Sequence, residues 1–189
     1  FLGLVDDADI FTGWNSEGFD IPYTVNRITR ILGKDYNRQW CLWGKHPKAR
    51  EYEKFGKTAV TYDLIGRVHL DYLELYQKYT YHELHTYRLD YVGEIELGER
   101  KTQYEGTLDQ LYNKDFKKFI EYNIRDVEIV SMLDDKLKLI EQVFAIAYDA
   151  KVNYSDAYGS VRIWDVIIHN YLINQRIVIP QKRPSTKDK

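Results

Sequence analysis

Cysteine is almost absent from this sequence. Cys41 is the single cysteine among 189 residues, so no internal disulfide can form, and we expect a reducing compartment such as the cytoplasm. Long apolar runs are absent too. No stretch approaches 18 consecutive apolar residues, which argues against a transmembrane helix and against a membrane as partner. These absences favour a globular domain.

Net charge is also small. The chain has 27 Lys and Arg against 29 Asp and Glu, a formal charge of −2, so it is not a globally basic nucleic-acid binder. Any contact with nucleic acid must therefore come from a local surface. With 44% hydrophobic and 30% charged residues, the composition is that of a globular protein. The length suffices for one well-packed domain, or for one domain with an appendage.

Both ends look like the edges of a longer protein. The chain lacks an initiator Met and opens on apolar residues, and it ends with PQKRPSTKDK, which is short, basic and punctuated by proline. We expect a piece of a longer polypeptide, although processing by a protease would look the same.

Strand-like alternation and helical spacing follow one another along the chain, which favours an α/β layered domain. A strand is predicted at 9–14, then a loop and a helix that starts near Pro22 and stops at Gly33. The polar segment 34–55, rich in Lys and Arg, is predicted to lie outside the core. The remaining predicted elements are a β-hairpin formed by 58–62 and 67–72, helices at 73–79 and from about 87, a loop at 94–106, a turn at 108–112, a long helix at 116–144, a helix at 164–172 and a strand at 177–179.

Asp126 is the most informative residue, because it occupies the apolar stripe of the long predicted helix. A carboxylate held against apolar packing is costly unless a cation, metal or donor compensates it. Tyr122 lies one turn earlier on the same face, and the two side chains together suit metal and water. The alternative is an Asp at the edge of the stripe, solvated or paired with Arg125 or a lysine. The stripe is formed by Phe119, Tyr122, Asp126, Val130, Leu133, Leu137, Ile140 and Phe144.

A second candidate lies in NSEGFD, where the strand at 9–14 ends and a helix begins. Asp20 at the start of a helix can simply cap it. The carboxyl ends of strands are also where ligands bind in α/β sheets. Neither candidate is specific alone, and the two together, in this order, are more so. The seventeen tyrosines, several of them interleaved with Lys and Arg, are candidates for stacking on single-stranded bases, or else surface and core-edge residues.

The segment WNSEGFDIPY resembles the second exonuclease motif of family B DNA polymerases, and YNIRD resembles the third. LDYLELYQKYTY, GERKTQYEG, YDAKV and VRIWDVIIHNYL are similar, in the family's order, to the proofreading segment of tailed-phage, T-even-like polymerases, with 34–57 least well matched. The resemblance implies an α/β, ribonuclease-H-like 3′→5′ exonuclease domain at 1–179, truncated at its N-terminal strands, with a hairpin near 58–72. The basic tail at 180–189 would lead toward the polymerase palm.

The resemblance also implies roles for individual residues. Family B exonucleases hold two Mg²⁺ or Mn²⁺ ions with carboxylates, and those ions stabilise charge on the attacking and leaving oxygens. The matching positions are the metal ligands Asp20 and Asp126, Tyr122 for the attacking water, Lys101 near the scissile phosphate, and Asn15 and Phe19 around the terminal nucleotide.

One departure from the family is important. The family's site uses four carboxylates, two of them from an Asp-x-Glu on a strand well upstream of the second motif. Asp7 and Asp9 lie too close to Asp20 to match that spacing, and we expect them to be surface acids. The chain alone is therefore predicted to be inactive.

The expected partners are a single-stranded 3′ primer end and the remainder of the polymerase, in the host cytoplasm if the protein is viral. An exposed sheet edge would favour self-association. Two alternatives stay open, namely a non-catalytic DNA-binding or scaffolding module of a split polymerase, and a complete one-metal nuclease.

Overall fold

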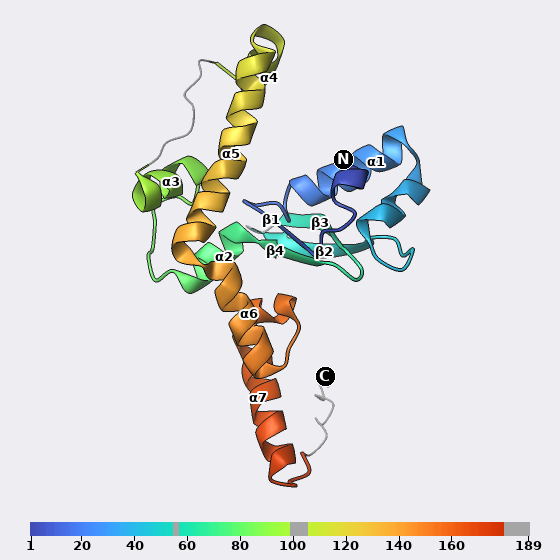
Figure 1. The fold of residues 1–189 in the computed structure, drawn as a ribbon, viewed down its shortest axis with the longest axis vertical. Coiled ribbons are helices and arrows are strands. Elements are labelled where there is room, and N and C mark those ends of the chain that lie inside the picture. The colour runs from blue at the N-terminus through green and yellow to red at the C-terminus, as the bar shows by residue number, and fades with distance from the viewer. Residues whose placement is uncertain (55–56, 99–105, 180–189) are drawn as a thin grey trace, which may run out of the picture. The chain divides into compact units, whose positions relative to one another are not determined.

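The computed structural model describes residues 1–54, 57–98 and 106–179. The chain divides into two compact units, Phe1–Glu141 and Gln142–Lys189 (Figure 1). The sequence predicts one domain at 1–179, and that boundary stays a prediction. Within the described residues, no helix has both the length and the apolar character needed to cross a bilayer.

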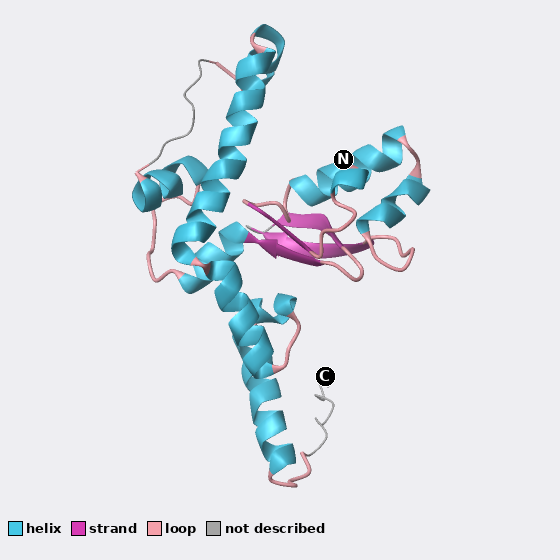
Figure 2. Cartoon of the chain, viewed as in Figure 1, coloured by secondary structure: helices cyan, strands magenta, loops and turns pink. Residues whose placement is uncertain are grey.

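The first unit is a mixed α/β structure with two small sheets (Figure 2). One sheet is a parallel pair and the other is an antiparallel hairpin. The strands are β1 (Ile10–Gly13), β2 (Lys48–Lys54), β3 (Lys57–Asp63) and β4 (Val68–Asp71). The helices are η1 (Leu2–Leu4), α1 (Asp20–Ile31), η2 (Lys34–Trp40), α2 (Tyr72–Tyr79), α3 (Leu89–Leu97), α4 (Leu108–Lys114), α5 (Phe116–Leu137) and the start of α6 (Leu139–Ala150).

The parallel pair β1–β4 places two chain segments side by side. Ile10 pairs with Val68 and Gly13 pairs with Asp71, so both strands end at the same edge of the sheet. The loop that leads from β1 to α1 therefore emerges beside the last residue of β4. The predicted strand at 9–14 is confirmed, and the predicted helix after it is α1, which ends just before Gly33 at a φ of 101°.

The predicted hairpin between 58–62 and 67–72 is wrong. β3 pairs with β2, with Thr61 opposite Arg50, and β4 pairs with β1 instead. Leu70 of β4 lies opposite Thr12 of β1 and is fully buried in this arrangement. Alternation over a few residues indicates a strand but cannot show which other strand it pairs with.

The expectation that residues 34–55 lie outside the core is also wrong. This segment forms η2 and β2, and Trp40 and Cys41 are almost fully buried. The Lys and Arg residues that made the segment look polar are not buried where the structure describes their side chains, whereas its Trp40 and Cys41 are. The core under α1 consists of Ile21, Val25, Ile28, Trp40, Cys41 and Leu64, with Leu2, Phe11, Tyr62 and Ile65 packed against it.

Helices α2, α3 and α5 contribute further buried residues to the first unit, apart from the core under α1. Ile129 and Leu133, one turn apart on α5, are fully buried. On α3, the carboxylate of Glu96 accepts hydrogen bonds from the Tyr76 hydroxyl at 2.8 Å and from the Lys136 ammonium at 3.0 Å, which ties α2, α3 and α5 together. The predicted helices at 73–79 and from about 87 are confirmed as α2 and α3.

Several predicted boundaries differ from the structure. The long helix expected at 116–144 breaks at Lys138, whose φ of 54° ends α5 in a left-handed cap. The predicted turn at 108–112 is the helix α4, and the predicted loop at 94–106 begins with the last turn of α3. Residues 177–179 form no strand with any described residue.

The second unit contains the rest of α6, η3 (Tyr154–Tyr158) and α7 (Ser160–Asn174). Phe144 and Tyr154 pack against each other with ring centroids 4.9 Å apart. The helix predicted at 164–172 lies within α7.

Hairpin β2–β3 is fastened to the loop between β1 and α1, and this contact can be tested. The hydroxyl of Thr61, which is 1% exposed, donates to the backbone carbonyl of Glu17 at 2.9 Å. Thr61→Val removes this donor and should lower the free energy of unfolding by about 1 kcal/mol in urea titrations. The matched control Thr58→Val changes an exposed threonine of the same strand and should have no measurable effect. Equal effects of the two substitutions would contradict the fastening.

Candidate functional site

One buried carboxylate holds the loop between β1 and α1. Asp71, the last residue of β4, is 1% exposed. Its Oδ1 accepts from the backbone N–H groups of Asn15 and Leu73, both at 3.0 Å, and its Oδ2 accepts from that of Glu17 at 2.9 Å. Asp71 therefore caps α2 and fixes the loop at the same time. Asp71 was not among the predicted site residues, although an Asp directly before the apolar run YLEL is a helix-start signal.

The hairpin holds the same loop from its other side. The Glu17 carboxylate pairs with the Arg50 guanidinium, and Arg50 Nε also donates to Asp63 at 3.0 Å. Within the loop, Asn15 adopts a left-handed φ of 58°, a conformation that non-glycine residues rarely take. Contacts from two sheets thus hold the loop in which this left-handed residue lies.

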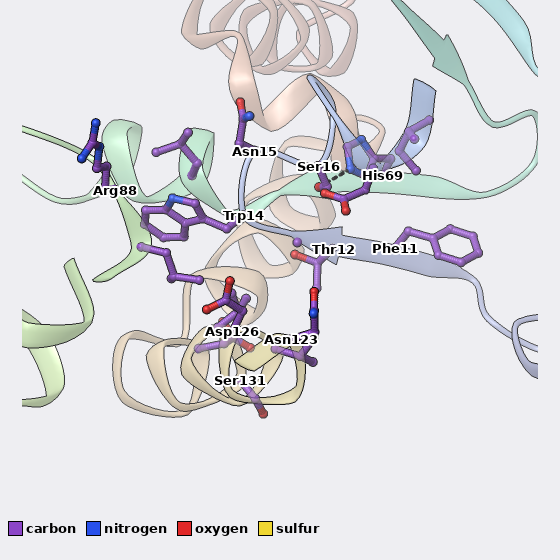
Figure 3. Close-up of a pocket in the computed structure, with 18 of the residues that line it drawn as sticks. Phe11, Thr12, Trp14, Asn15, Ser16, His69, Arg88, Asn123, Asp126 and Ser131 are labelled. Atoms are coloured by element: carbon purple, nitrogen blue, oxygen red, sulfur yellow. Dashed lines mark hydrogen bonds between the residues drawn. The ribbon is translucent and has the colours of Figure 1, made fainter. Parts of the chain in front are cut away.

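A pocket of about 1360 Å³ opens at the carboxyl end of β1. Its walls come from β1, the loop, α1, residues 86–90 and α5. Four of the six predicted site residues line it: Asn15, Asp20, Tyr122 and Asp126. Figure 3 shows Asp126 and Asn123 on the side of α5 that faces Thr12 and Trp14 of the strand region, with Asn15 and Ser16 beyond.

The other two predicted residues are placed differently. Phe19 is not among the residues that line the pocket. Its ring is 63% exposed and stacks on Tyr23, with centroids 5.8 Å apart and planes 8° apart. Lys101 lies outside the described residues. The roles assigned to all six residues stay predictions, and what the structure adds is where five of them lie.

The pocket is acidic. Besides Asp20 and Asp126, the carboxylates of Asp90 and Asp134 line it, and Arg88 is its one Lys or Arg within the described ranges. Burial raises the pKa of Asp20 and the nearby Asp71 carboxylate raises it further, while a hydrogen bond to its own backbone lowers it in part. Such a site attracts a cation.

The donor set suits a hard divalent ion but is small. The Asp126 Oδ1 atom is buried, and carboxylate oxygens are the ligands that Mg²⁺ and Mn²⁺ prefer. Over the described parts of the chain, no three or more His, Cys, Asp or Glu side chains gather closely enough to hold a metal ion. Asp20 and Asp126 are therefore only candidate ligands, and too few for a complete ligand set.

A serine and a histidine meet in the lining of the pocket. Ser16 Oγ and His69 Nε2 are 2.8 Å apart, and both residues line the pocket (Figure 3). Burial lowers the pKa of His69 in spite of the opposing effect of Asp71 and Glu17, so the ring stays uncharged at neutral pH. The sequence analysis missed this pair because 53 positions separate its members and no local pattern joins them.

Fold and site together define an α/β domain with an acidic ligand pocket at the carboxyl end of a parallel strand pair. Comparison with known proteins gives the family. The model of the exonuclease domain of DNA polymerase family B matches residues 1–92. The chain belongs to this family: it is part of the exonuclease region of a family B DNA polymerase.

Two phage proteins are similar over most of the chain. The chain is 35% identical over 178 residues to the DNA-directed DNA polymerase of Enterobacteria phage T4. The matched residues make up 94% of this chain and 20% of the relative. The chain is 36% identical over 174 residues to the DNA-directed DNA polymerase of Escherichia phage RB69, covering 92% of this chain and 19% of the relative. A DNA polymerase of Autographa californica nuclear polyhedrosis virus is 24% identical over 147 residues, 75% of this chain and 14% of the relative. The chain thus spans about a fifth of the length of the two phage relatives.

The role of Asp71 leads to a stability prediction. Asp71→Ala removes the cap of α2 and leaves the N–H groups of Asn15 and Glu17 without their acceptor, so the free energy of unfolding should fall by about 2–4 kcal/mol. Chemical denaturation measures this loss. Asp7→Ala, at an exposed acid, is the matched control and should be neutral within about 0.5 kcal/mol. A loss for Asp71→Ala as small as that of the control would mean that the loop is held in some other way.

Proposed function

We propose that this chain is the proofreading part of a DNA-directed DNA polymerase, a ribonuclease-H-like 3′→5′ exonuclease region that hydrolyses the 3′-terminal nucleotide. One observation carries the proposal. Asp20 and Asp126, one from each of the two motifs WNSEGFDIPY and YNIRD, line the same pocket together with Asn15 and Tyr122. Two segments far apart in the chain thus bring their acids to one cavity at the carboxyl end of β1.

The two acids suit divalent metal as ligands. Ionised Asp20 is disfavoured by its burial and by the Asp71 charge, and a bound cation would offset both effects. When bound, two Mg²⁺ or Mn²⁺ ions supply stabilisation of the charge that develops on the attacking and leaving oxygens of the phosphodiester.

The remaining residues would bind and orient the reactants. Tyr122 lies on the same face of α5 as Asp126, and its hydroxyl can hydrogen-bond a water and hold it toward the phosphate. The Asn15 amide offers donors and an acceptor to the terminal nucleotide. Lys101 would offset phosphate charge. Phe19 lies outside the pocket, so its exposed ring would contact a base next to the cavity and not inside it.

We further propose that residues 1–189 alone are nearly inactive. Two protein carboxylates bind one metal weakly, and Asp7 and Asp9 are exposed and lie outside the pocket. The missing ligands would come from an Asp-x-Glu strand supplied by the rest of the polymerase. Within the described residues β1 pairs only with β4, and the other edge of β1 is where such a strand, or a second copy of this chain, would add.

The competing hypothesis is a non-catalytic DNA-binding or scaffolding module of a split polymerase. The small ligand set among the described residues favours it. Both hypotheses predict that the chain binds DNA, and only the first predicts that the completed site hydrolyses it.

A nuclease assay separates the two. The 189-residue chain is incubated with end-labelled single-stranded DNA and Mg²⁺ or Mn²⁺, with and without a polypeptide that carries the Asp-x-Glu strand of a family B relative. Hydrolysis should be near background for the chain alone, should rise strongly on addition, and should return to background in Asp126→Asn or in EDTA. Asp135→Asn changes an exposed acid of the same helix and should leave the restored activity unchanged.

The other outcomes have distinct meanings. Strong hydrolysis by the chain alone that Asp126→Asn abolishes would show a complete one-metal nuclease, and would overturn the need for further carboxylates. DNA binding without hydrolysis under every condition would favour the scaffolding module.

A further inference from the structure

Four exposed side chains follow one another along the outer face of α1. Phe19, at the cap of the helix, is followed by Tyr23, Arg27 and Arg30 at spacings of four, four and three, which places them on one face. The rings of Phe19 and Tyr23 are 63% and 56% exposed, and both arginines are exposed. The opposite face is the buried one and carries Ile21, Val25 and Ile28.

The two rings form a flat aromatic surface. Their planes differ by only 8°, with centroids 5.8 Å apart, and neither ring contributes to the core under α1. Exposed large apolar groups that lie together mark binding surfaces more often than isolated ones do. A stacked pair of aromatic rings offers its outer faces to any flat unsaturated group, and the bases of single-stranded DNA are such groups.

The two guanidiniums are available for anions. Other arginines of this unit are engaged: Arg38 pairs with Asp35, and Arg50 pairs with Glu17 and Asp63. No ion pair or side-chain hydrogen bond with a described residue is found for Arg27 or Arg30. Their charge can therefore be used for phosphate, which arginine binds with a fork of donors.

The face begins beside the pocket. Asp20, the first residue of α1, and Thr24, one turn later, both line the pocket. From Phe19 to Arg30 the face extends for about 16 Å at the rise of an α-helix, which is the length of a few nucleotides. A strand whose end lies in the pocket can thus continue along α1, with bases on the rings and phosphates on the guanidiniums.

We infer that the outer face of α1, formed by Phe19, Tyr23, Arg27 and Arg30, binds single-stranded DNA as it enters the pocket. The inference rests on the proposed function for the identity of the ligand. Two aromatic rings followed by two cationic side chains complement the two features that every nucleotide has, a base and a phosphate. Contact of this face with the same face of a second copy would bring four like charges together, which is unfavourable.

Fluorescence anisotropy of a labelled oligodeoxythymidylate, titrated with the 189-residue chain in EDTA at several salt concentrations, tests the inference without any metal or hydrolysis. The double variant Arg27→Gln/Arg30→Gln should bind more weakly and should reduce the slope of log K against log[salt] by about 1.4, because each phosphate contact on a single strand contributes about 0.7. The matched control Lys138→Gln/Arg162→Gln removes the same net charge from exposed positions elsewhere and should keep the wild-type slope.

The aromatic half of the face has its own test. Tyr23→Ala should lower the affinity about tenfold while leaving the salt slope unchanged, and Tyr23→Phe, which keeps the ring, should restore it. Tyr148→Ala, at a ring that is 84% exposed on α6, is the control and should bind like wild type.

The inference is overturned if the two charge variants change the slope equally, or if Tyr23→Ala binds as well as Tyr148→Ala. It is also overturned if sedimentation shows a dimer that Tyr23→Ala dissociates while DNA affinity stays the same, since the face would then join two copies. Because EDTA is present throughout, the binding test is independent of hydrolysis. A chain that binds DNA through α1 but shows no hydrolysis with Mg²⁺ or Mn²⁺, even after the Asp-x-Glu polypeptide is added, would contradict the proposed nuclease function alone.

Discussion

The buried carboxylate of Asp71 is the constraint on which the site depends. A charge at 1% exposure loses its hydration, and burial raises the pKa of Asp71 for that reason, while the backbone N–H groups of Glu17, Asn15 and Leu73 stabilise the ionised form. These three hydrogen bonds offset part of the free-energy cost of burying the carboxylate. The same hydrogen bonds hold the loop after β1, which contains the left-handed Asn15. Asp20 follows three residues after Glu17, the last loop residue bonded to Asp71.

The opposite wall of the pocket is fixed by different means. Helix α5 is anchored by Ile129 and Leu133, and by the Lys136–Glu96 pair to α3. Asp126 lies about two turns before Leu133, so the packing of the apolar residues decides where this carboxylate points. One carboxylate of the candidate site is thus positioned by hydrogen bonds and the other by apolar packing. Both supports lie in the unit Phe1–Glu141, so the pocket needs nothing from the second unit.

Local patterns in the sequence predict the parts of this arrangement but not their pairing. The strand at 9–14, helix α1 with its stop at Gly33, and helix α2 follow from spacing and cap residues within a few positions. The pairing of β4 with β1 joins residues 58 positions apart and no local pattern marks it, so the sequence predicted a hairpin with the nearer strand instead. For the candidate site, Asp20 and Asp126 were predicted through their motifs, and both line the pocket, while their roles stay predictions. Asp71 and His69 were missed because their roles depend on a loop that is distant in the sequence and adjacent only in the fold.

The central claim is that Asp20 and Asp126 bind the same divalent ion. Paramagnetic broadening by Mn²⁺ tests it most directly. In the amide spectrum of the ¹⁵N-labelled chain, substoichiometric Mn²⁺ should broaden the signals around Asp20 and those around Asp126 together, EDTA should reverse the effect, and Asp20→Asn should weaken it at both places. Broadening confined to one of the two segments, or centred on the exposed acids near Asp7, would contradict a shared metal site.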